Sequence, residues 1–128
     1  MASTTSEATM ASLPPAVVKA YDLLLWVMNH VSKFPRSHRF VLGERIETKM
    51  LAILELLIEA AFSRHKSQCL HNANRQLQVI RLLLRVGKDL GFTSLRQYEF
   101  VTGELVRLGQ QIGGWSKQAG EVAHGPSV

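Results

Sequence analysis

The chain has 128 residues, and its 46% hydrophobic content can build the core of one domain and excludes a globally disordered protein. Fifteen Lys and Arg residues exceed ten Asp and Glu residues, and the resulting net charge of +5 favours a polyanionic partner such as nucleic acid. A single cysteine, Cys69, excludes an internal disulfide and a cluster of zinc-binding thiolates. No apolar run is long enough to cross a bilayer, and the "MASTTSEATMASLPP" start lacks the features of a secretion signal. We therefore expect a cytoplasmic protein with no membrane partner.

The first predicted helix follows a Ser/Thr/Ala-rich segment, residues 1–13, which we expect to be flexible. Pro14 and Pro15 suit the first turn of a helix, where a missing N–H is tolerated. The helix ends at Phe34-Pro35, because the residue before a proline is pushed out of the α region. Apolar residues recur in this helix at spacings of four and three, and they are Val17, Tyr21, Leu24, Met28 and Val31.

Three further helices show the same periodicity. The second begins near Phe40, and the third runs from about Ser67 to Leu90. The fourth follows "LGFTS", in which Gly91 suits a helix C-cap and the Thr-Ser pair supplies an N-cap. The three expected buried seams are Ile46, Met50, Ile53, Leu57 and Ala61; Leu70, Ala73, Leu77, Ile80, Leu84 and Gly87; and Tyr98, Val101, Leu105, Leu108, Ile112 and Trp115.

No segment alternates with the period of two that is typical of a strand. Four helices with short connections predict an all-α protein, an up-down-up-down four-helix bundle. The bundle is expected to span residues 14–118, followed by a flexible tail, residues 119–128.

The basic stretch "KFPRSHRF", Lys33 to Phe40, lies between the first two predicted helices. Its proline accounts for the break between them, and basic residues are ordinary in a loop. On these residues alone, a turn is favoured over a binding site.

The third helix has a second apolar face. A helix that is apolar on two sides must be buried twice, and a lone four-helix bundle can bury it only once. The first helix gives a similar signal, because Leu23 and Trp26 fall on its polar side, among Lys19, Asp22, His30 and Lys33. We therefore predict self-association, although scattered exposed apolar residues are also normal. The candidate interface residues are Leu23, Trp26, Val79, Leu82, Leu83, Val86 and Leu90.

Between the two apolar faces of the third helix lies an edge with Asn74, Arg81, Arg85 and Lys88. Like charges at this spacing repel slightly, so a compensating group outside the helix is expected. Two interpretations are equally open. In the first, phosphates of a nucleic acid compensate the cations. In the second, the cations pair with carboxylates of the second helix, within the bundle or across a subunit contact. Those carboxylates are Glu44, Glu47, Glu55 and Glu59.

The sequence carries no recognisable catalytic signature, so we expect no enzymatic activity, no cofactor and no metal site. HExxH, GxSxG, P-loop and dinucleotide-binding patterns are all missing from it. Cys69 near Arg64 and Lys66 is a weak candidate for a thiol of lowered pKa. The "GQQIGG" stretch lies within the fourth helix, where its small residues suit close helix packing rather than phosphate binding. The histidines, which show no metal-ligand spacing, are His30, His38, His65, His71 and His124.

Three stretches carry a resemblance to a known family. "FPRSHRFVLGERIETKMLAILELLIEAA", "LRVGKDLGF" and "LGQQIGGWSK" resemble the Avd (accessory variability determinant) proteins of diversity-generating retroelements. These are related to the four-helix proteins encoded in intervening sequences of bacterial 23S ribosomal RNA genes. The resemblance covers roughly residues 15–118, and its most specific parts are the PRSHRF turn and the GGW near the end of the fourth helix.

The resemblance implies a basic four-helix protomer that assembles into a ring-shaped homopentamer and is not itself an enzyme. It also implies two further partners, the error-prone reverse transcriptase of the retroelement and nucleic acid, either template RNA or cDNA. Arg81 and Arg85 become the first candidates for contact, and the PRSHRF turn becomes as plausible a binding surface as a structural turn. The candidate residues for nucleic-acid or polymerase contact are Arg36, His38, Arg39, Arg75, Arg81, Arg85 and Lys88.

A function of a different class remains open. The chain would then be a homo-oligomeric protein-interaction module of the intervening-sequence type, whose basic residues form ion pairs and bind no nucleic acid. Neutralising the cations of the third helix distinguishes the two functions.

Overall fold

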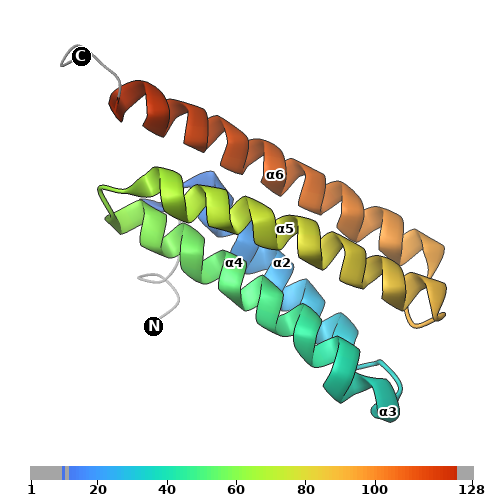
Figure 1. Cartoon of the computed structure of the whole chain (residues 1–128). Coiled ribbons are helices and arrows are strands. Elements are labelled where there is room, and N and C mark those ends of the chain that lie inside the picture. The colour runs from blue at the N-terminus through green and yellow to red at the C-terminus, as the bar shows by residue number, and fades with distance from the viewer. Residues whose placement is uncertain (1–9, 11, 124–128) are drawn as a thin grey trace.

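A computed structural model of the chain describes residue 10 and residues 12–123. Within that part the chain is helical and contains no strand (Figure 1), which confirms the predicted all-α class and the four-helix bundle. The four long helices are α2 (Pro15–Val31), α4 (Glu44–Phe62), α5 (Lys66–Asp89) and α6 (Leu95–Ala123).

The expected domain boundaries fall near the limits of the described residues. The segment 1–13, expected to be flexible, lies almost entirely outside them, as do residues 124–128 of the expected tail. Helix α6 continues to Ala123, past the expected boundary at residue 118.

The helices pack in a closed order. Helix α4 contacts α2 and α5, and α6 contacts α5 and α2. The α4–α5 connection and the C-terminal part of α6 lie at one end of the bundle, whereas the α5–α6 connection and the segment before α4 lie at the other (Figure 1). No helix in the described residues is both long and apolar enough to cross a membrane.

The core follows the predicted seams most closely in the second half of the chain. All six predicted seam residues of α5 are buried, as are the middle four of α6. In α4, Ala60 is fully buried and takes the place expected for Ala61. In α2 the prediction was partly wrong, because Tyr21 and Met28 are exposed. Helix α2 is contacted by α4 on one side and α6 on the other, so its buried arc is centred on Ala20 and Val27.

The stretch from Lys33 to Phe40 is a turn only as far as Pro35. A short helix α3 (Arg36–His38) and a π-helical turn η1 (Arg39–Gly43) follow and lead directly into α4. Pro35 starts this segment, since its carbonyl accepts hydrogen bonds from the N–H groups of His38 and Arg39 at 2.9 and 3.0 Å. Gly43 allows α2 to approach, because a Cβ at this position would lie 2.6 Å from a methyl carbon of Val31. The helix therefore begins earlier than the sequence pattern predicts.

The α5–α6 connection confirms both predicted caps. Gly91 has a φ of 84°, and the N–H groups of Gly91 and Phe92 bond to the carbonyls of Lys88 and Gly87. This is a Schellman motif, which favours glycine at the left-handed position. At the start of α6, Ser94 and Gln97 exchange side chain to backbone hydrogen bonds at 2.9 and 3.1 Å, forming a capping box.

A buried histidine links this connection to α2. His30 was expected on the polar side of its helix, yet it is only 5% exposed, and its Nε2 lies 2.8 Å from Oγ1 of Thr93. The imidazole stacks on Trp26 at 4.7 Å and meets the edge of Phe34 at 5.3 Å. Burial lowers the pKa of His30, and the nearby Lys33 adds to this effect. The neutral ring is therefore part of the packing at this end.

The glycines of the "GQQIGG" stretch differ in their surroundings. A Cβ at Gly109 would lie 3.1 Å from a methyl carbon of Leu77, so this glycine does allow α5 and α6 to pack closely. Gly113 and Gly114 are exposed and have nothing within 4 Å of the Cβ position. The prediction of close packing is therefore confirmed for Gly109 and wrong for the other two.

Candidate nucleic-acid interface

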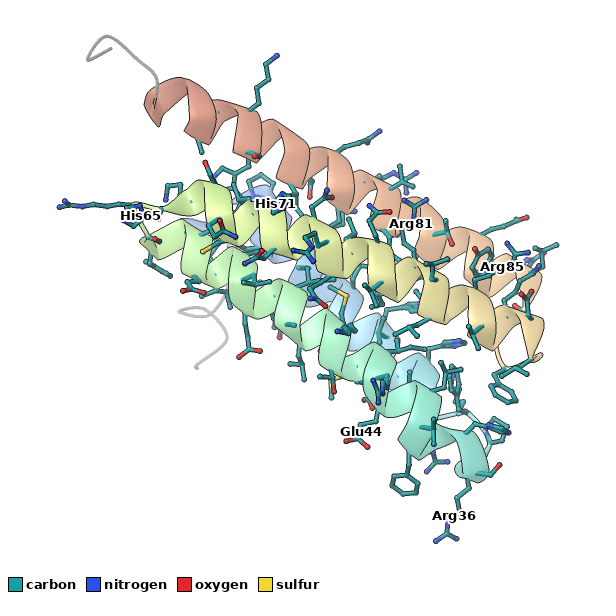
Figure 2. All side chains as sticks on the ribbon, in the orientation of Figure 1. Arg36, Glu44, His65, His71, Arg81 and Arg85 are labelled. Atoms are coloured by element: carbon teal, nitrogen blue, oxygen red, sulfur yellow. The ribbon has the colours of Figure 1, made fainter. Side chains whose placement is uncertain are left out.

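The three cations of α5 lie on the edge of the helix that faces α6. Arg81, Arg85 and Lys88, here called the cationic edge, project from three successive turns, and Figure 2 shows Arg81 and Arg85 along the same helix. A shallow hollow of about 300 Å³ opens at this edge. It is lined by Gln78, Arg81, Leu82, Arg85 and Tyr98.

Few groups compensate the charge of the cationic edge. The Nε of Arg85 donates to both carboxylate oxygens of Asp89, at 3.2 and 3.1 Å, and this contact raises the pKa of the guanidinium. Lys88 Nζ lies 3.7 Å from the same carboxylate and 5.8 Å from the centre of the Tyr98 ring. Among residues 12–120, Arg81 pairs with no carboxylate and donates to a neutral amide, Oε1 of Gln78, at 3.4 Å. Two of the three cations therefore share a single carboxylate, and the edge keeps an excess of positive charge.

The glutamates of α4 do not pair with this edge within the protomer. In residues 12–120, none of the four lies within 4 Å of a cationic nitrogen, since the ion pairs found there involve only Asp89 and Glu104. The arrangement of the helices explains this, because α4 and α6 lie on different sides of α5 (Figure 1). The cationic edge borders the hollow that Tyr98 of α6 helps to line. Of the two ion-pair interpretations, only the one across a subunit contact remains a prediction.

The basic residues before α4 form a separate group. Arg36, His38 and Arg39 are all exposed, and Figure 2 shows Arg36 pointing away from the end of the bundle. His38 packs against Phe92 with ring centres 4.8 Å apart, and Arg39 Nη2 donates to the Phe34 carbonyl at 3.4 Å. The π-helical turn places two apolar side chains, Phe40 and Val41, in solvent beside them.

The sequence-predicted contact residues therefore do not form a single site. Arg36, His38 and Arg39 lie at the end of the bundle, and the cationic edge lies along α5 (Figure 2). Arg75, also exposed, lies on α5 about two turns before Arg81. Tyr98 and Asp89 were missed by the sequence analysis. The only signal for Asp89 is its position four residues after Arg85, and Tyr98 was assigned to the core seam of α6.

The second apolar face of α5 is exposed in the protomer. Val79, Leu82, Val86 and Leu90, here called the outer face, all reach solvent, and Leu82 is 69% exposed. Leu83 beside them is half-buried.

The interface candidates on α2 lie elsewhere. Leu23 is only 3% exposed and belongs to the core, so its predicted place on the polar side of α2 was wrong. Trp26 is half-buried between His30 and Phe100, with ring centres 4.7 and 5.7 Å away. Both residues face the α6 side of α2, which the bundle itself covers.

The structure offers no site for metal chemistry in its described residues. No group of three or more His, Cys, Asp and Glu side chains there could hold a metal ion. Cys69 is buried, and burial raises the pKa of its thiol, with the Glu59 carboxylate adding to the shift. The suggestion of a thiol with a lowered pKa was therefore wrong.

These features define a small basic helical-bundle protein with an undercompensated cationic edge and an exposed apolar helix face. A family model described as bAvd-like matches residues 16–119, and the chain belongs to this family. The match confirms the Avd resemblance over nearly all the residues for which it was predicted, and it indicates an accessory protein of the Avd type. No curated protein and no solved structure matches the chain.

Proposed function

We propose that this protein is a non-enzymatic accessory protein of a diversity-generating retroelement, which binds template RNA or cDNA together with the error-prone reverse transcriptase. The family supports the accessory role. The observation that carries nucleic-acid binding is the cationic edge, where Arg85 and Lys88 share one carboxylate and Arg81 contacts a neutral amide beside an open hollow.

The proposed mechanism is electrostatic capture. Lys and Arg side chains that neutralise phosphates displace the counterions condensed on the nucleic acid, and the release of these counterions favours binding. Arg81 has no carboxylate partner within residues 12–120, so its guanidinium can donate two parallel hydrogen bonds to a phosphate without breaking an ion pair there. Tyr98 in the same hollow offers an aromatic ring to an unpaired base. These contacts read the backbone and not the base sequence.

The apolar surfaces support assembly of the protomer into a ring, the homopentamer implied by the family. The outer face of α5 is one surface. A second lies where α2 and α4 pack, because Leu25 and Met28 of α2 and Leu51 and Ile58 of α4 are exposed along this seam. Two different surfaces suit a heterologous contact, in which each protomer presents one surface to its neighbour and closes a ring. Repetition of the cationic edge around such a ring would strengthen weak phosphate contacts.

The experiment is a binding titration with structured RNA and duplex DNA across a salt series. It compares the unmodified protein with the Arg81→Ala/Arg85→Ala/Lys88→Ala variant, and the oligomeric mass is recorded on the same samples. We expect the variant to stay assembled, to bind more weakly, and to lose about one unit of salt slope per neutralised contact. Reverse transcriptase is then added to each sample to measure its capture by the protein.

Two results oppose the proposal. If the unmodified protein shows no salt-sensitive binding, the chain is a protein-interaction module and its positive charge is structural. If the variant loses its assembly as well, the cations pair across subunits, and the oligomeric interaction module becomes the better account.

A further inference from the structure

A second hollow lies far from the cationic edge, at the end of the bundle where α4 meets α5. This hollow, here called the end groove, has a volume of about 580 Å³, which is within the range of small-molecule sites. Figure 2 shows His65 at this end and Arg81 and Arg85 further along α5. The end groove is lined by Arg64, His65, Lys66, Ser67, Gln68, Trp115, Gln118 and Ala119.

One wall of the end groove is cationic. Arg64, His65 and Lys66 are consecutive in the α4–α5 connection, and Arg64 and His65 are exposed. Lys66 is held in place, because its Nζ donates to the Ala60 carbonyl at 2.7 Å. In residues 12–120 no carboxylate lies within 4 Å of a cationic nitrogen of this wall, and no Asp or Glu is among the lining residues. A ligand that fits it carries negative charge.

The other wall is apolar and flat. Trp115 and Ala119 lie one turn apart on α6, both half-buried, and the polar amide of Gln118 lies between them in the sequence. An indole in an open groove offers a stacking surface to a planar ring. A planar apolar group and an anion must therefore lie close together in a ligand that uses both walls.

We propose that the end groove binds a nucleoside phosphate, with the base against Trp115 and the phosphate against Arg64 and Lys66. Ser67 and Gln118 supply hydrogen-bonding groups for the sugar and the base edge. The same chemistry is offered by a free nucleotide and by the terminal nucleotide of a strand with a 5′-phosphate. An acidic peptide would satisfy the cations, but it lacks the planar ring that the indole wall favours. This site is independent of the cationic edge.

The chain has two tryptophans, so Trp26→Phe leaves Trp115 as the sole indole reporter. The probes for its fluorescence are AMP, adenosine, inorganic phosphate, a short single strand with a 5′-phosphate, the same strand with a 5′-hydroxyl, and an acidic peptide. We expect saturable quenching by AMP, by the phosphorylated strand, or by both. Whichever of these two probes binds shows whether the ligand is a free nucleotide or the end of a strand. Adenosine, phosphate and the 5′-hydroxyl strand should bind at least about tenfold more weakly.

Two variants locate the site. Arg64→Ala should weaken binding of AMP or the phosphorylated strand by about tenfold, because it removes one charge-assisted hydrogen bond. The matched control is Arg96→Ala, which removes an exposed arginine from the start of α6 at the opposite end of the bundle and should leave binding unchanged. Isothermal titration of AMP and the phosphorylated strand into the unmodified protein repeats the measurement without the Trp26 substitution.

The inference is overturned if neither AMP nor the phosphorylated strand binds below about 1 mM. It is also overturned if Arg64→Ala binds like the parent, if inorganic phosphate binds as tightly as AMP, or if the acidic peptide binds in preference to both. The Arg81→Ala/Arg85→Ala/Lys88→Ala variant should bind the nucleotide normally. Failure of the end groove and failure of the proposed function can therefore be told apart.

Discussion

Two sides of α5 share one helix but differ in chemistry. The outer face presents four apolar side chains to solvent. The cationic edge, about 140° away around the helix, presents three cations, of which two pair with one carboxylate. Apolar surface gains free energy by leaving water, whereas exposed cations gain it by replacing the counterions of a polyanion. Assembly and nucleic-acid binding should therefore be separable by substitutions within this one helix.

The largest effect is expected from a charge on the outer face. Val86→Glu should weaken self-association at least about a hundredfold, because the assembled state would have to bury an unpaired carboxylate. The side chain is exposed in the protomer, so the variant should keep its helical circular dichroism. Native mass spectrometry measures the loss of the oligomer.

The matched control for this substitution is Asn74→Glu. It places the same charge at an exposed position of α5 away from the outer face, and it should leave the mass unchanged. An oligomer that survives Val86→Glu would show that the outer face is not an interface.

A fall in pH should lower the stability of the whole fold, and it should therefore affect the outer face and the cationic edge together. The pKa of His30 is lowered in the folded protein, so the unfolded chain takes up the proton first as the pH falls. Stability is therefore fully present above about pH 6.5 and declines below it, by at most about 1.4 kcal/mol per pH unit for one proton. Chemical denaturation at pH 7.5, 6.5 and 5.5 measures the free energy of unfolding.

His30→Gln should flatten this part of the pH dependence, because the buried ring no longer titrates. The control is His71→Gln, which replaces an exposed imidazole on α5. This variant should keep the pH dependence of the free energy of unfolding that the parent shows. If His30→Gln keeps the full dependence, another group carries it.

A smaller loss of stability is expected at the end of α5. Gly91→Ala should lower the free energy of unfolding by about 1 kcal/mol, because the residue has a φ of 84° and an L side chain is disfavoured there. Thermal or urea denaturation measures the change. Self-association through the outer face and RNA binding by the cationic edge should be weakened equally, because both surfaces depend on the folded α5.

The same substitution at Gly113 provides a control of opposite sign. This glycine lies inside α6 in the helical conformation, with nothing within 4 Å of its Cβ position. Gly113→Ala should therefore raise stability by about 0.5–1 kcal/mol. Equal effects at the two positions would contradict the role of the left-handed turn.

The smallest effect is expected from Asp89→Asn. Arg85 and Lys88 would lose their shared carboxylate, and affinity for RNA should rise about two- to fivefold while the oligomeric mass stays constant. Filter binding at low salt measures the change, with Asp22→Asn on α2 as the exposed control. A fall in affinity would indicate that Asp89 positions Arg85 for its ligand.

The two sides of α5 could be predicted because this helix has a single seam with regular spacing. The predicted seam, the outer face and the cationic edge all lie where the 100° rotation per residue places them. Helix α2 differs, because its own apolar residues occur all around the helix, so their spacing alone does not select the buried arc. Leu23 and Tyr21 were exchanged for this reason.

The buried histidine, the end groove and the pairing of the α4 glutamates could not be predicted, because each depends on residues distant in the sequence. His30 meets Thr93 across 63 residues, and the hydrogen bond hides a histidine that the helical pattern places in solvent. The end groove joins Arg64, which the sequence analysis named only as a basic neighbour of Cys69, to Trp115, which it assigned to a core seam. The unpaired glutamates of α4 likewise follow from which side of α5 that helix covers.

The most direct test of separate roles for the two sides is site-specific photo-crosslinking from neighbouring positions on α5. A benzophenone amino acid replaces Gln78, which lines the hollow of the cationic edge, or Val79 on the outer face, in the presence of labelled RNA. We expect position 78 to crosslink to RNA and position 79 to a second copy of the chain. RNA crosslinks from position 79, or a protein dimer formed from position 78 alone, would contradict the account.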